Sequence, residues 1–166
     1  EAIRPISPEP LRNQINDCLP RGLSLDQVAE VESGAQSLGD LINAASYSAR
    51  LEAPISSAWL ARDLEERLVG VTELKVTRER KGRQEEVDVL PSIHRIAAAD
   101  DGTLEMVLRV GGSGAARPDD VIRGLFGPAA SARITRQDLL VLREGEVLSP
   151  MACRGLLRDA PAPAGA

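Results

Sequence analysis

The chain has 166 residues, 43% of them hydrophobic, and a formal net charge of −5, so it buries about 70% of its unfolded surface in one core or two small ones. Aromatic residues make up only 2%, which excludes the stacking platforms of single-stranded nucleic-acid binders. Two cysteines exclude a disulfide framework, and no apolar run spans a bilayer, so we expect a protein of the reducing cytoplasm.

The first predicted element is a helix that starts after Ser7 and ends at Leu19. Proline lies in its first turn, and its apolar residues recur at helical spacing. Residues 23–32 then alternate apolar and polar side chains, which predicts a strand. The chain starts at Glu1 without an initiator methionine, so we expect a fragment whose earlier portion is missing.

The middle of the chain predicts a strand followed by the most regular helix. A short helical turn within residues 37–45 precedes a strand at residues 47–52. The helix covers residues 55–69, and its acidic residues lie outside a stripe formed by Trp59, Leu60, Leu64 and Leu68.

Two hairpins follow this helix. Residues 71–77 and 86–90 read as strands that a basic turn around Gly82 joins. Residues 93–98 and 104–110 read as a second pair, joined by the Asp-Asp-Gly turn at 100–102.

A glycine-rich loop at residues 111–114 leads into a helix with Pro118 in its first turn. Gly127 and Pro128 end that helix, and residues 132–142 form the last predicted strand. Residues 146–166 are predicted to be a disordered tail, because alanine, proline and glycine dominate their end.

This order predicts an α+β fold for residues 37–145. Strand, helix, two hairpins, helix and strand together make a ferredoxin-like βαββαβ plan with an inserted hairpin. Two helices then cover one face of an antiparallel sheet.

Four stretches carry a resemblance to a known family. They are LINAASY at 41–47, RKGRQEEVDVLP at 80–91, ARPDDVIR at 116–123 and RITR at 133–136. Together they resemble the domain of unknown function of radical-SAM-linked bacterial proteins, over residues 5–142. The resemblance implies that residues 1–36 are the closing helix and strand of a truncated first ferredoxin-like unit.

The resemblance also implies a role beside a radical-SAM domain or protein. A radical-SAM cluster needs closely spaced thiolates, whereas Cys18 and Cys153 lie far apart. We therefore expect a non-catalytic accessory domain, without a metal or cofactor of its own, that positions a substrate or RNA. Paired ferredoxin-like units also occur in RNA-processing proteins, which is an analogy of fold alone.

Other residues are weaker candidates for chemistry. His94 is the only histidine, so no Cys/His zinc site or local catalytic triad can be proposed, and we expect it on a strand face opposite Ile93. The glycine-rich loop before a helix is a candidate phosphate site, but Asp119 and Asp120 oppose an anion there. A plain strand-to-helix connection is the favoured interpretation.

The main candidate binding surface is the basic hairpin. The candidate residues are the hairpin cations and the arginine that follows the glycine-rich loop: Lys75, Arg78, Arg80, Lys81, Arg83 and Arg117. A polyanion such as RNA would bind these cations with strong salt dependence. The chain would then act as an independent RNA-binding or RNA-processing protein. The favoured alternative is a hairpin whose charges prevent sheet aggregation. A third hypothesis is a half-domain that only completes a fold with missing upstream sequence.

Overall fold

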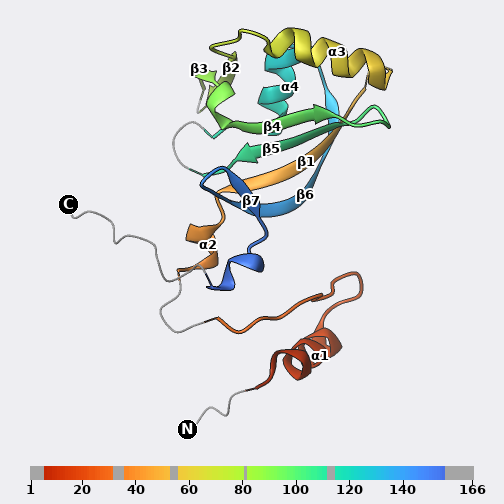
Figure 1. Cartoon of the computed structure of the whole chain (residues 1–166), viewed down its shortest axis with the longest axis vertical. Coiled ribbons are helices and arrows are strands. Elements are labelled where there is room, and N and C mark those ends of the chain that lie inside the picture. The colour runs from red at the N-terminus through yellow and green to blue at the C-terminus, as the bar shows by residue number, and fades with distance from the viewer. Residues whose placement is uncertain (1–5, 32–35, 53–55, 81, 112–114, 156–166) are drawn as a thin grey trace, which may run out of the picture. The chain divides into compact units, whose positions relative to one another are not determined.

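The computed structural model describes residues 6–31, 36–52, 56–80, 82–111 and 115–155 (Figure 1). The chain divides into two compact units. The first comprises Glu1–Gln36 and Met151–Ala166, and the second comprises Ser37–Pro150.

The first unit contains helix α1, Pro8–Cys18, and the short 3-10 helix η2, Ala152–Gly155. The predicted helix is confirmed, but the strand predicted at residues 23–32 is wrong for its described part, residues 23–31. The side chain of Asn16 makes hydrogen bonds to both backbone groups of Leu25. Its Nδ2 donates to the Leu25 carbonyl at 3.0 Å, and its Oδ1 accepts from the Leu25 N–H at 2.7 Å. Alternation alone does not make a strand, because a strand needs a neighbouring backbone for its ladder.

The second unit contains a curled antiparallel sheet of five strands in the order β4-β5-β1-β6-β7, with a separate β2-β3 hairpin (Figure 1). Its sheet strands are β1 (Ala44–Leu51), β4 (Ile93–Ala98), β5 (Leu104–Arg109), β6 (Ala132–Arg143) and β7 (Glu146–Leu148). The hairpin strands are β2 (Lys75–Arg80) and β3 (Arg83–Asp88). The helical segments are α2 (Leu38–Leu41), α3 (Ser57–Leu68), η1 (Leu90–Ser92) and α4 (Pro118–Phe126).

Helices α3 and α4 cover one face of this sheet, and the main core lies between them and the strands (Figure 1). The helices contribute Leu60, Leu64, Val121, Ile122 and Leu125, and the strands contribute Ala49, Leu104, Met106 and Leu108. Every second strand residue thus points to the core. The residues between them form the opposite, helix-free face.

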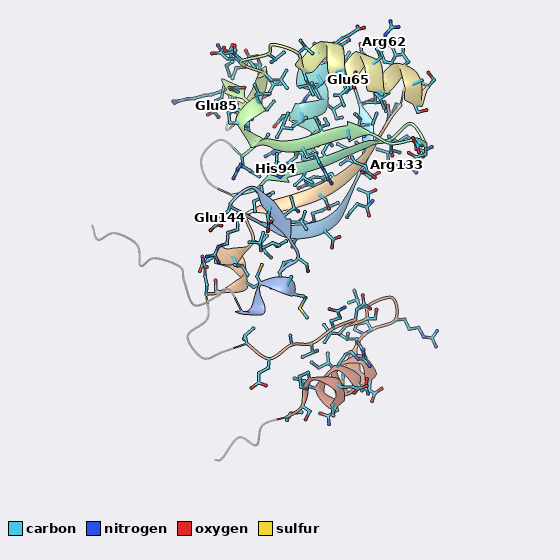
Figure 2. All side chains as sticks on the ribbon, viewed as in Figure 1. Arg62, Glu65, Glu85, His94, Arg133 and Glu144 are labelled. Carbon is cyan, nitrogen blue, oxygen red and sulfur yellow. The ribbon has the colours of Figure 1, made fainter. Side chains whose placement is uncertain are left out.

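The predicted helix stripe is right at its centre and wrong at Trp59. Leu60 and Leu64 are buried in the core, whereas Trp59 is 45% exposed. Successive helix residues lie about 100° apart, so Trp59 falls to the side of the stripe that Leu60 and Leu64 define. Figure 2 shows Arg62 and Glu65 on the outer side of the same helix.

Arg67 joins the two helices. Its NH1 donates to the Leu125 carbonyl at 2.7 Å, and its guanidinium lies 5.6 Å from the centre of the Phe126 ring. Asp63 accepts from its Nε. An arginine can make these contacts together because its planar group offers donors at the edge and a face for stacking.

The inserted hairpin packs against α4 through a glycine. A Cβ added at Gly124 would lie 3.0 Å from Leu74 Cγ and 3.1 Å from Val76 Cγ1. Val76 is buried, so its contact with the helix backbone needs a residue without a side chain. The carboxylate of Asp88 closes the base of the hairpin, where it accepts from the N–H groups of Leu74 and Leu90.

The predicted hairpin positions are confirmed with shifted ends, and the strand at residues 93–98 agrees at both ends. Residues 146–148, predicted as part of the tail, instead form β7 and pair with β6. Residues 156–166 lie outside the described part. Within the described residues, no helix is long and apolar enough to cross a membrane.

Candidate functional site

The basic hairpin places Lys75 and Arg78 opposite acids, whereas Arg80 and Arg83 lie opposite each other. In the β2-β3 ladder Lys75 pairs with Asp88, Thr77 with Glu86 and Arg78 with Glu85. Opposite charges in register attract one another across a strand pair. The acidic run that follows the basic run in sequence therefore folds back on it.

Lys75 is held by two carboxylates. Its Nζ lies 2.7 Å from Glu73 Oε2 and 3.7 Å from Glu86 Oε1. The hydrogen bond to Glu73 and the charges of both acids raise the pKa of Lys75. All three side chains are exposed to solvent, so the two ion pairs contribute little to the stability of the fold.

Arg78 points toward α4 and not to solvent. Its NH1 lies 3.7 Å from Oδ2 of Asp120, and Arg123 NH2 lies 2.6 Å from Oδ1 of the same carboxylate. Asp120 is 1% exposed, Arg78 19% and Arg123 40%. Two guanidinium groups thus share one buried carboxylate, and their buried Nε atoms have no hydrogen-bond partner.

Arg83 and Arg117 are the remaining predicted cations with described side chains. Arg117 is exposed just before α4, and its backbone N–H donates to Asp120 at 3.3 Å. Arg83 is exposed on β3. Lys81, the side chain of Arg80 and residues 112–114 of the glycine-rich loop lie outside the described residues. The predicted surface therefore keeps Arg83 and Arg117 as its described cations without an ion pair.

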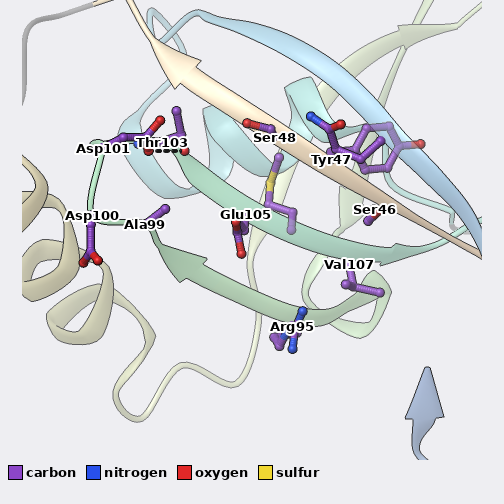
Figure 3. A pocket seen from close by; sticks show the side chains of 12 residues that line it. Ser46, Tyr47, Ser48, Arg95, Ala99, Asp100, Asp101, Thr103, Glu105 and Val107 are labelled. Carbon is purple, nitrogen blue, oxygen red and sulfur yellow. Dashed lines mark hydrogen bonds between the residues drawn. The ribbon is translucent and has the colours of Figure 1, made fainter. Parts of the chain in front are cut away.

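A different site lies on the helix-free face of the sheet. Four strands and the β4-β5 turn surround a pocket of about 580 Å³ (Figure 3). Its lining residues are Ser46, Tyr47, Ser48, Arg95, Ala99, Asp100, Asp101, Thr103, Glu105, Met106, Val107 and Gln137. This volume lies in the range of sites for small molecules, about 300–1,000 Å³.

Asp101 forms a rigid corner of this pocket. Its Oδ1 accepts from the Thr103 hydroxyl at 2.6 Å and from the Thr103 N–H at 3.0 Å (Figure 3). Its Oδ2 lies 3.1 Å from Arg50 NH2. The Thr103 hydrogen bonds, with the charge of Arg50, lower the pKa of Asp101. One oxygen of this carboxylate is therefore bonded within its own turn, and the other faces Arg50 on β1.

Two β-bulges shape the helix-free face. Ser46 pairs with Asp138 and Tyr47 with Arg136, which leaves Gln137 as an extra residue that lines the pocket. Ile93 pairs with Leu108 and Arg95 with Val107, so His94 is the extra residue of β4. Bulges re-aim side chains next to sites, and the sequence carries no signal for them at these positions.

His94 is half-buried at its bulge, so strict alternation does not assign its face (Figure 2). Cys18 is exposed and Cys153 is buried. Among the residues that the structure describes, no group of three or more His, Cys, Asp or Glu side chains could hold a metal ion.

Comparison with protein families shows the family to which the chain belongs. Residues 1–118 match the model of a family described as an uncharacterized protein conserved in bacteria (DUF2344). The chain belongs to this family. The DUF2344 match covers the inserted hairpin and every pocket-lining residue except Gln137. No curated protein and no solved structure matches the chain.

Proposed function

We propose that this chain is a non-catalytic accessory domain of a bacterial radical-SAM system, and that it positions a substrate on the helix-free face of its sheet. The four quoted stretches support the radical-SAM link by resemblance, and the DUF2344 match supports a family conserved in bacteria. The cytoplasm is the compartment in which we expect it.

The observation that carries the positioning role is the pocket on the helix-free face. Its charged side chains Arg95 and Glu105 make no ion pair within the described residues, although both line the pocket. Unpaired polar groups that converge in a hollow are the usual basis of ligand recognition. On the opposite face, α3 and α4 pack against the strands and form the core.

The fold supports a finer proposal for residues 37–145. The order β4-β5-β1-β6, with all neighbours antiparallel, is consistent with a ferredoxin-like unit that carries β2-β3 as an insertion. We retain the proposal that residues 1–36 derive from a preceding unit, with α1 as its closing helix.

The test is a pull-down of the tagged full chain from its native bacterium, followed by mass spectrometry and iron analysis. We expect recovery of a radical-SAM protein together with its iron. If no radical-SAM protein is recovered when the tagged chain is present at its cellular level, the accessory role is contradicted. Stoichiometric iron or turnover in the purified chain alone contradicts its non-catalytic nature.

A second candidate function is RNA binding through the basic hairpin, because Arg83 and Arg117 are exposed without ion pairs among the described residues. Filter binding at rising salt tests it with Arg83→Glu/Arg117→Glu, and Arg62→Glu on α3 is the control. For a true site, the slope of log affinity against log salt drops by about 0.7 per lost single-strand phosphate contact. An unchanged slope and affinity remove this surface as an RNA site.

A further inference from the structure

Among the described residues, Arg95 and Glu105 line the pocket on the helix-free face without an ion pair. In the β4-β5 ladder Arg95 pairs with Val107, and Ala97 pairs with Glu105. Arg95 and Glu105 are therefore diagonal neighbours on one face, at a distance of roughly 7–8 Å between backbones. Both point into the same pocket (Figure 3).

On the side of Glu105 that faces away from Arg95, the neighbouring strand β1 lines the pocket with small polar side chains. Ser48 lies directly opposite Glu105, and Ser46 lies opposite Val107. Serine hydroxyls leave space above the strands and both donate and accept hydrogen bonds. Gln137 adds an amide from the β6 bulge.

The acidic residues at the pocket further restrict the class of ligand that it can bind. Asp101 already accepts from Thr103 and pairs with Arg50, so its charge is partly balanced within the protein. Asp100 is exposed at the rim, and with Glu105 it repels a polyanion. A base-stacking ligand is also disfavoured, because the only ring in the lining, Tyr47, packs against the helix-covered core.

We propose that this pocket binds a small zwitterion of the amino-acid class. Arg95 binds the carboxylate as a two-pronged donor, and Glu105 binds the ammonium group. The hydroxyls of Ser46 and Ser48 on β1, next to Glu105, hydrogen-bond to polar atoms on that side of the ligand. This inference rests on the proposed function, in which the helix-free face positions a substrate, and it names the class of that substrate.

The experiment uses the full chain and a panel of the common L-amino acids at about 5 mM in a thermal-shift assay, since a ligand that binds only the folded state raises the melting temperature. Calorimetry then gives the affinity of each amino acid that raises it. We expect the N-acetyl and carboxamide derivatives, which lose one charge each, to bind at least about tenfold more weakly.

Two variants test which side chain binds the carboxylate of the amino acid and which binds its ammonium group. Arg95→Gln should weaken the parent amino acid about tenfold and leave the carboxamide unchanged, whereas Glu105→Gln should weaken the parent and leave the N-acetyl form unchanged. Arg62→Gln and Glu65→Gln on the outer side of α3 are matched controls (Figure 2). A merely structural role would weaken all forms equally.

The inference is overturned if no amino acid raises the melting temperature, or if both variants weaken the parent and both derivatives alike. The pull-down reports on the accessory role independently. Capture of a radical-SAM protein without amino-acid binding removes this inference alone. Amino-acid binding without capture removes the accessory role alone.

Discussion

The inserted hairpin and the helix-free face both carry charge, but they use it differently. On the hairpin, Lys75 and Arg78 each lie within 3.7 Å of a carboxylate. On the helix-free face, Arg95 and Glu105 point into one pocket without an ion pair among the described residues. Two cations of the basic run are thus bound by carboxylates of the same fold, whereas the opposite charges of the β4-β5 hairpin are left available.

The strongest way to break this contrast is to remove the carboxylate that holds Arg78. Asp120→Asn leaves two guanidinium groups without a counter-charge, and we expect a loss of about 2–3 kcal/mol in unfolding free energy. This lies at the low end for a buried pair because Arg123 is 40% exposed. Urea denaturation measures it, and Asp119→Asn, next to it on the exposed side, is the control. Equal stability of both variants would contradict the buried network.

The second prediction concerns the contact between the hairpin and α4. Gly124→Val places methyl groups against Leu74 and Val76, where even a Cβ lies at 3.0 Å. Overpacking of this kind should destabilise the fold by about 1–2 kcal/mol. Gly39→Ala is the matched control, because its Cβ would have no neighbour closer than 3.9 Å. Wild-type stability in Gly124→Val would show that the hairpin is not packed there.

The third prediction tests the frame of the helix-free face. Asn43 Nδ2 donates to the Leu142 carbonyl at 3.0 Å, and its Oδ1 accepts from the Leu142 N–H at 2.6 Å. Asn43→Ala removes both bonds and should cost about 1 kcal/mol. Asn13→Ala on α1, whose side chain is exposed, should have no comparable effect. A loss of similar size in both would argue against a specific role.

The smallest effect is a pH dependence at the pocket corner. Thr103→Val removes the hydroxyl that donates to Asp101, so the pKa of Asp101 should rise toward its ordinary value. Because the folded pKa is lowered, the stabilisation is present above the ordinary carboxyl pKa. It disappears as the pH falls through the folded pKa. NMR titration of the Asp101 carboxyl measures the change, and Thr135→Val on the same face is the control. An unchanged Asp101 titration would refute the assignment.

Much of the local structure follows from the sequence. Proline in the first turn and the periodicity of Leu60 and Leu64 predict α4 and α3, and the turn residues predict both hairpins. The candidate site is less predictable, because it depends on register. Arg78 counts as a cation in the sequence, but only the packing of β2 on α4 shows that Asp120 holds it.

By itself the sequence determined which segments become helices and hairpins, because helix periods, strand alternation and turn residues act within a few neighbours. Only the tertiary structure decided which charges meet. Arg95 and Glu105 face one pocket through the β4-β5 hairpin, whereas Gln137 enters it because the pairing of β1 with β6 and a bulge bring a distant segment to that hairpin. Such pairing depends on the whole sheet, and no local pattern encodes it.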